Sequence, residues 1–171
     1  MKKIASFLFT VLLALSLSAC DDVADWLLDD DDSTNSGAEE IADDSDLLTD
    51  DLRSAIVDLA REQIGLPYLY GGEDPSTGFD CSGLCYYCYT SNGIEIPRVS
   101  RDQYAGGNQV GMEGAKYGDI VAFYSPVSHV GIITSSTTFI HAPSSGSVVK
   151  EQEFIGYWEN QITGVVSYID E

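Results

Sequence analysis

The chain has 171 residues, of which 28 are acidic and 8 are lysine or arginine, giving a formal net charge of −20. This charge argues against a nucleic-acid-binding protein, because contacts to phosphates need clustered lysine and arginine side chains. The acidic residues are spread unevenly, so the chain divides into regions of different character.

The first 19 residues have the features of an export signal peptide. Lys2 and Lys3 form a basic start, and the apolar stretch over residues 4–17 is too short to span a bilayer comfortably. The segment ends in Leu17-Ser18-Ala19-Cys20, which resembles a bacterial lipobox. The resemblance implies cleavage before Cys20, lipid on its sulfur, and an extracytoplasmic protein anchored by lipid to the bacterial cell membrane. The alternative is an ordinary secretion signal that happens to end in cysteine.

Residues 20–51 form an acidic segment. Between Asp21 and Asp51 there are fourteen aspartates and glutamates and no lysine or arginine. Such a segment cannot bury enough apolar surface to offset the entropy lost on ordering, so we expect a disordered linker after the lipidated cysteine. A second interpretation, in which the carboxylates gather divalent cations, is less favoured than a solvated spacer.

Residues 52–171 have the size of one domain with a single hydrophobic core. A first helix is predicted after Thr49, which can cap it, with Gly65 and Pro67 ending it. Its apolar stripe repeats with helical spacing and consists of Leu52, Ile56, Leu59, Ala60 and Ile64.

The remaining elements follow in the order helices first, strands second. A glycine-rich turn precedes a helix predicted over residues 81–91, and a short helical turn is expected over residues 100–107. Strand-like runs follow, with Pro126 closing the first of them. This order predicts an α+β domain with an antiparallel sheet. The predicted strands cover residues 119–124, 129–134, 138–142, 147–154 and 164–169.

The sequence Asp80-Cys81-Ser82-Gly83 places a cysteine at the start of the second predicted helix. A helix N-terminus lowers a thiol pKa, and the thiolate is the nucleophile, so this position favours a reactive cysteine. The chain has two histidines, His129 and His141. If the hairpin between them turns at Ser135 and Ser136, the two histidines lie directly opposite each other on one face. A slip of one residue would separate them. Nucleophile, base and orienting group are the parts of an activated thiol.

Cys85 and Cys88 follow Cys81 with the spacing C-x3-C-x2-C. Radical-SAM enzymes hold an iron–sulfur cluster with this spacing, and a zinc site is a second alternative. Positions i, i+4 and i+7 also share one helix face, so the simpler interpretation is that Cys85 and Cys88 are buried thiols packed behind the nucleophile.

The ordered motifs of residues 65–143 resemble those of the NlpC/P60 family of papain-like cysteine peptidases, which cut bacterial cell-wall peptides. The resemblance extends over nearly all of residues 52–171. The motifs that carry it are residues 65–72, Gly78-Phe79-Asp80-Cys81-Ser82-Gly83, residues 96–100, residues 118–121, residues 128–132 and residues 139–143.

This resemblance implies a papain-like fold with helices packed on an antiparallel sheet, and a role for each motif residue. Cys81 is the expected nucleophile, His129 the base, and His141 the group that orients the base. Tyr68 is expected near the reacting carbonyl, and Asp80 and Ser82 are expected to recognise the substrate peptide. The alternative for these two is purely structural: Asp80 caps the helix and Ser82 completes its first turn.

The expected reaction is hydrolysis of a peptidoglycan stem peptide between D-glutamate and the following diamino acid, without a metal or other cofactor. The expected partners are peptidoglycan peptides or muropeptides and, through the lipid, the membrane; we expect a monomer and no nucleic acid. Two alternatives remain: a lipoprotein that binds wall peptides without cutting them, or an amidase or acyltransferase on the same fold.

Overall fold

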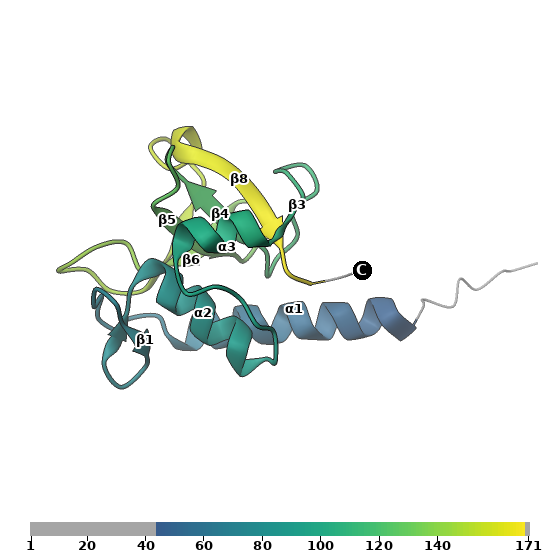
Figure 1. Cartoon of the computed structure of the whole chain (residues 1–171), viewed down its shortest axis with the longest axis horizontal. Coiled ribbons are helices and arrows are strands. Elements are labelled where there is room, and N and C mark those ends of the chain that lie inside the picture. Colours follow the sequence, from purple (N-terminus) through teal and green to yellow (C-terminus); the bar gives the residue numbers. More distant parts are fainter. Residues whose placement is uncertain (1–43, 170–171) are drawn as a thin grey trace, which may run out of the picture. The chain divides into compact units, whose positions relative to one another are not determined.

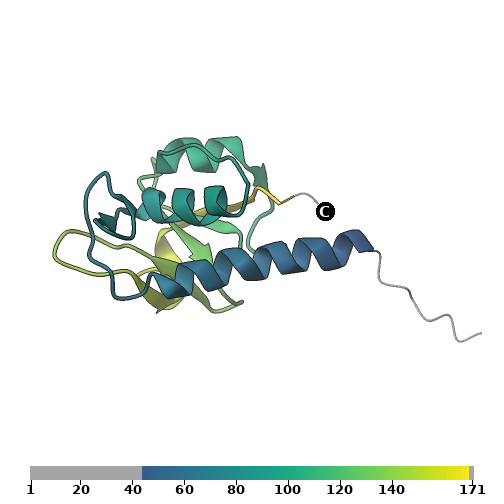
Figure 2. The ribbon, with the colours of Figure 1, turned by 90° about the horizontal axis from the view of Figure 1, so that it is seen from below.

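The computed structural model describes residues 44–169. Three α-helices precede most of the strands, as Figure 1 shows. In Figure 2, α1 runs lengthwise below α2, and both helices contact strand β5. The helices are α1 (Asp44–Glu62), α2 (Cys81–Ser91) and α3 (Ser100–Gly106), and a 3-10 turn, η1 (Glu159–Gln161), lies near the end of the chain.

The main sheet has six strands in the order β3-β8-β4-β5-β6-β7, and every neighbouring pair is antiparallel. A separate two-stranded ribbon is formed by β1 (Glu73–Asp74) and β2 (Gly78–Phe79). The prediction of an α+β fold with an antiparallel sheet is confirmed. The strands of the main sheet are β3 (Asn108–Gln109), β4 (Ile120–Phe123), β5 (His129–Ile133), β6 (Thr138–His141), β7 (Lys150–Glu153) and β8 (Ile162–Ser167).

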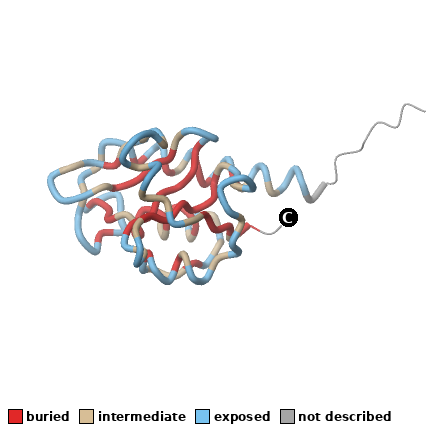
Figure 3. Tube along the Cα trace, turned by 90° about the horizontal axis from the view of Figure 1, so that it is seen from above, coloured by how far each residue is buried: buried red, intermediate tan, exposed pale blue. Residues whose placement is uncertain are grey.

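The central strands are buried on both faces, and their alternating side chains enter two different apolar clusters. Ile132 and Ile140 point toward the helices, where they pack with Ile56 and Leu84. Phe139, next to Ile140, belongs to a second cluster on the opposite face of the sheet. Figure 3 shows the buried strands at the centre of the chain trace and exposed chain around them.

The first helix begins earlier than the sequence indicates. Residues 44–51, assigned above to the disordered linker, are helical, and the predicted cap Thr49 lies inside the helix with its hydroxyl donating to the Asp46 carbonyl oxygen at 2.9 Å. Ile64 lies beyond the helix and is 45% exposed, so it is not part of the buried stripe. The buried face includes Arg53, whose guanidinium pairs with Asp119 at 2.8 Å. No helix within residues 44–169 is long and apolar enough to cross a membrane.

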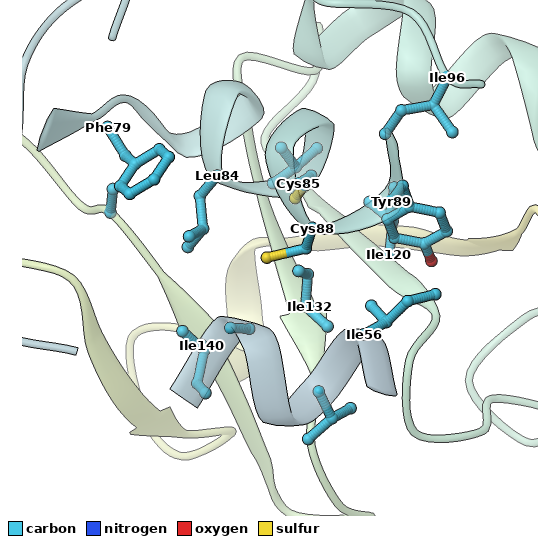
Figure 4. Close-up of a cluster of buried hydrophobic side chains, with 14 of the residues drawn as sticks. Ile56, Phe79, Leu84, Cys85, Cys88, Tyr89, Ile96, Ile120, Ile132 and Ile140 are labelled. Carbon is cyan, nitrogen blue, oxygen red and sulfur yellow. The ribbon is translucent and has the colours of Figure 1, made fainter. Parts of the chain in front are cut away.

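The second helix has the predicted bounds, and Cys85 and Cys88 are fully buried on it. Both are free thiols packed among Leu84, Ile56 and Ile132 between α2, α1 and the sheet, as Figure 4 shows. Burial raises the pKa of both thiols, so both remain protonated. Among residues 44–169 no group of three potential ligand side chains is placed to hold a metal ion. The prediction of two buried thiols is confirmed.

Candidate active site

Cys81 is the first residue of α2 and lines a cleft of about 560 Å³. Asp80, in extended conformation, caps the helix: its Oδ1 accepts the backbone N–H of Gly83 at 2.6 Å. Val127 and Ser128, the residues immediately before β5, form part of the same cleft. The cleft therefore joins the start of α2 to the start of β5.

The pKa of the Cys81 thiol is raised, contrary to the expectation from its place at a helix start. Burial is the largest effect and disfavours the thiolate. Hydrogen bonds from the backbone N–H groups of Val130, Ser82 and Cys81 itself lower the pKa. The negative charge of Asp80 raises it further. The helix start thus supplies donors, but desolvation outweighs them in the free protein. Cys81 therefore rests as a thiol in the free protein.

The two histidines form a directly bonded pair. Nε2 of His129 lies 2.8 Å from Nδ1 of His141, and both rings are buried. His129 is the first residue of β5 and His141 the last of β6, so the two antiparallel strands bring the rings to one end of the hairpin. Since Nε2 of His129 is engaged, its Nδ1 is the nitrogen left for other chemistry.

The pairing of these strands differs from the prediction by two residues. Ile132 lies opposite Ile140, and continuing this register places His141 opposite Gly131 rather than opposite His129. The cause is a longer turn, in which the backbone N–H of Thr134 donates to the Thr138 carbonyl oxygen. A shift of two residues keeps both side chains on one face, so they meet as diagonal neighbours.

Burial holds both imidazoles in the neutral form. It lowers the pKa of His129 to about 4. It also lowers the pKa of His141 to about 3, with smaller contributions from His129 and from Lys150. A neutral His129 can accept a proton at neutral pH, as a general base must.

The carboxylate of Asp80 is surrounded by donors. Oδ2 accepts the Gly71 backbone N–H at 2.8 Å, and Arg98 donates to both oxygens at 2.9 and 3.1 Å. Burial alone would raise the pKa of Asp80, but the hydrogen bonds from Arg98, Gly83 and Gly71 lower it. The charged Asp80 carboxylate therefore links the glycine-rich turn, the start of α2 and Arg98 through hydrogen bonds. It borders the cleft with its oxygens already occupied, and Ser82 beside it accepts a further hydrogen bond from Arg98 at 3.0 Å.

Tyr68 lines the same cleft as Cys81 and Asp80. Its backbone N–H donates to the Ser147 carbonyl oxygen at 2.9 Å, which fixes it beside the loop after β6. Burial raises the pKa of Tyr68, and the negative forms of Cys81 and Asp80 raise it further. Tyr68 therefore keeps its hydroxyl proton and can donate it in a hydrogen bond within the cleft.

The helix start depends on a close approach between two glycines. A Cβ at Gly83 would overlap the carbonyl oxygen of Gly72. That oxygen is held in place by the Asp80 backbone N–H and by Arg98, each at 3.0 Å, so it has little room to move. We expect Gly83→Ala to lower the free energy of unfolding by about 3 kcal/mol, measured by urea denaturation. Ser91→Ala, at the exposed end of the same helix, is the control and should change it by less than about 0.5 kcal/mol. Equal effects would contradict this account.

A comparison with protein families matches residues 65–167 to the NlpC/P60 family. This segment includes the cleft, Cys81 and both histidines. The chain belongs to the NlpC/P60 family. The expectation from the sequence motifs is thereby confirmed.

Relatives of this NlpC/P60 chain include named hydrolases. A probable endopeptidase of Corynebacterium glutamicum is 47% identical over 97 residues, which cover 57% of this chain and 46% of the relative. The gamma-DL-glutamyl hydrolase of Bacillus subtilis is 38% identical over 115 residues, covering 64% of this chain and 28% of the relative. The chain thus spans less than half the length of these curated relatives.

Solved structures show the same NlpC/P60 fold. The NlpC/P60 domain of the peptidoglycan hydrolase SagA is 36% identical with a TM-score of 0.61, covering 67% of this chain and 97% of that structure. The peptidoglycan hydrolase RipB of Mycobacterium tuberculosis is 27% identical with a TM-score of 0.65, covering 73% and 68% of the two chains.

Two residues of this NlpC/P60 site were missed by sequence reasoning. Arg98 appeared within the motif of residues 96–100 without a role, yet it joins Asp80 to the exposed Glu73, its Nε lying 2.6 Å from the Glu73 carboxylate. Trp158 lies outside every motif named above, yet its ring lies against both histidines. The roles of both residues depend on contacts between distant segments, for which spacing in the sequence gives no signal.

Proposed function

We propose that the chain is a cysteine peptidase that hydrolyses peptide bonds in the stem peptides of bacterial peptidoglycan. The observation that carries this proposal is the bonded pair of His129 and His141, in which His129 directly follows Ser128, a residue of the cleft that holds Cys81. The family and the names of the relatives support the same class of reaction.

The first chemical step joins the sulfur to the substrate carbonyl carbon. Nδ1 of His129 takes the proton of the Cys81 thiol as the sulfur attacks, because Nε2 is bonded to His141. The proton transfer converts a neutral pair into an ion pair only during the reaction. The negative charge that develops on the carbonyl oxygen is stabilised by the Cys81 backbone N–H and the Tyr68 hydroxyl.

The second half of the reaction releases both products. The tetrahedral intermediate breaks its C–N bond, and His129 returns its proton to the leaving amine, leaving a thioester on Cys81. His129 then takes a proton from water as the water attacks the thioester carbon. The C–S bond breaks, the sulfur recovers a proton, and the free carboxylic acid leaves.

The proposed scissile bond joins D-glutamate to the diamino acid that follows it. The resemblance of the motifs carries this choice, and the name of the gamma-DL-glutamyl hydrolase from Bacillus subtilis is consistent with it. The test is to digest purified muropeptides with the full chain and identify the fragments by mass. We expect products ending in D-glutamate and products beginning with the diamino acid. Cleavage elsewhere would overturn the bond assignment, and intact muropeptides would favour a protein that binds without cutting.

The pKa of His129 sets the expected pH dependence. The base must be neutral, and burial lowers the pKa of His129 to about 4, so neutral imidazole persists well below pH 6. The titratable groups that face the histidine pair are Tyr124, whose ring centroid lies 6.4 Å from that of His129, and Lys150, which lowers the pKa of His141. We expect kcat/KM to fall on the acid side only as the pH approaches about 4. The measurement is the initial rate of muropeptide cleavage from pH 3.5 to 8 at constant ionic strength. A half-maximal rate near pH 6.5, the usual pKa of an imidazole, would contradict this expectation.

We also propose that the protein is extracytoplasmic and anchored to the membrane through lipid on Cys20. This residue and the signal segment lie outside the described residues, so the proposal is supported by the sequence pattern alone. A Cys20→Ser variant expressed in a bacterial host should lose incorporation of labelled fatty acid and leave the membrane fraction. Retained fatty acid in the variant would refute the assignment of the lipidated residue.

A further inference from the structure

Trp158 packs against the two histidines of the proposed site. Its ring centroid lies 4.7 Å from that of His141, with the planes at 85°, and 5.4 Å from that of His129. The residue stands directly before the 3-10 turn, where its carbonyl oxygen accepts the Gln161 backbone N–H at 3.0 Å. Trp158 is half-buried, so one side of it covers the histidine pair and the rest faces outward.

The outer nitrogen of His141 has an unusual environment. Nε2 is buried and has no hydrogen-bond partner among residues 44–169. Two aromatic rings pack against the His141 ring: Trp158, nearly perpendicular to it, and Phe139, with its centroid at 4.8 Å and its plane at 63°. A neutral imidazole carries its proton on either Nδ1 or Nε2, and the surroundings of the two nitrogens decide which.

An aromatic face is electron-rich, so it attracts an N–H and repels a nitrogen lone pair. A perpendicular ring pair directs the edge of one ring at the face of the other. Nε2 has no polar partner among residues 44–169. We propose that the edge of His141 that carries Nε2 faces the indole, so that Trp158 is a positioning residue whose aromatic face holds the proton of His141 on Nε2 and thereby sets the tautomer of both histidines.

The tautomer of His141 determines the tautomer of His129, because the two rings share a hydrogen bond. When Nε2 of His141 carries the proton, its Nδ1 has a lone pair and accepts a hydrogen bond. His129 must then donate from Nε2, at the 2.8 Å contact, which leaves a lone pair on its Nδ1. That lone pair is what the proposed reaction needs to take the Cys81 proton. With the opposite tautomer, Nδ1 of His129 would carry the proton and would not be a base.

Only two histidines occur in the chain, so nitrogen NMR can determine which nitrogen of each ring carries the proton. The full chain is labelled with ¹⁵N-histidine, and the nitrogen shifts and their couplings to ring protons are recorded near pH 7 without substrate. We expect both histidines to carry their proton on Nε2. A proton on Nδ1 of His141 in the unaltered protein would overturn the inference, whatever the variants do.

The variants separate the aromatic face from simple packing. Trp158→Phe keeps an aromatic face and should keep both tautomers. Trp158→Leu removes it, and should give mixed tautomers and at least about a tenfold lower kcat with KM little changed. Phe154→Leu is the matched control, because Phe154 stacks on Phe139 at 4.8 Å in the same aromatic cluster. It should leave the histidine shifts and kcat near their original values.

If Trp158→Leu folds and keeps the original tautomers, the inference is wrong. If Trp158→Leu does not fold, the unaltered protein and Trp158→Phe still test the inference. A changed tautomer in Trp158→Phe, which keeps an aromatic face, would contradict the inference. The inference rests on the proposed function only for its meaning in catalysis. The tautomers are measured without a substrate, so failure to cleave muropeptides and failure of the tautomer assignment are separate results.

Discussion

Replacing Cys81 by alanine is expected to lower kcat for muropeptide cleavage by on the order of 10³-fold or more. The variant loses the atom that forms the thioester, and no other described thiol can replace it because Cys85 and Cys88 are fully buried. Folding should be retained, because Cys81 lies at the cleft with its side chain only partly in the core. The measurement is the initial rate of cleavage, with the free energy of unfolding determined for the same samples.

Cys88→Ala is the matched control for this experiment. It removes a sulfur from the same helix but from the core, so we expect a modest loss of stability, about 1 kcal/mol, and little change in kcat. A Cys81→Ala protein that cleaves at the original rate would refute Cys81 as the nucleophile. An equal loss of kcat in both variants, with both folded, would equally count against the specific role of Cys81.

His129→Gln is expected to lower kcat by on the order of 10³-fold, because the variant keeps a polar side chain but has no group that accepts and returns a proton. The Cys81 thiol rests protonated, so it depends on this base more than a free thiolate would. The loss should appear in kcat, since the base acts on the reacting atoms rather than on substrate binding. Rates over a range of substrate concentrations give kcat and KM separately.

His141 provides the comparison for that variant. We expect His141→Ala to cost less than His129→Gln, and His141→Asn to recover part of the loss, because an amide can still accept the hydrogen bond from His129. Unfolding measurements are needed for each, since both rings are buried. A His129→Gln protein with unchanged kcat, or a greater loss in His141→Asn than in His141→Ala, would contradict the assigned roles.

The parts of the fold that could be predicted from the sequence are those with strong local patterns. Helix α2 begins at Cys81 and ends at Ser91 as predicted, because Asp80 caps it and the Asn92-Gly93 pair ends it. The start of α1 was predicted wrongly. Its later turns pack in the core through Ile56 and Ala60, and the helix continues from them into the acidic residues that composition alone assigned to a linker. Strands β1, β2 and β3 have two residues each, too few for an alternating pattern.

The sequence predicted which residues form the site better than it predicted their contacts and pKa values. The residues were identified from motifs, and the two histidines do share one face, but a longer turn made them diagonal neighbours. The pKa of Cys81 was predicted in the wrong direction, because burial is a property of the folded domain and outweighs the helix start. Arg98 and Trp158 act through contacts to distant segments, so no local pattern identifies them.

The thioester that we propose on Cys81 can be observed directly by mass spectrometry. The full chain is mixed with muropeptides, quenched with acid within the first turnovers, and analysed by intact mass and then by peptide mapping. We expect an added mass equal to the acyl fragment of the substrate, located on the peptide that contains Cys81 and absent from Cys81→Ala. Cleavage that proceeds in Cys81→Ala, or an adduct mapped to a different residue, would contradict it.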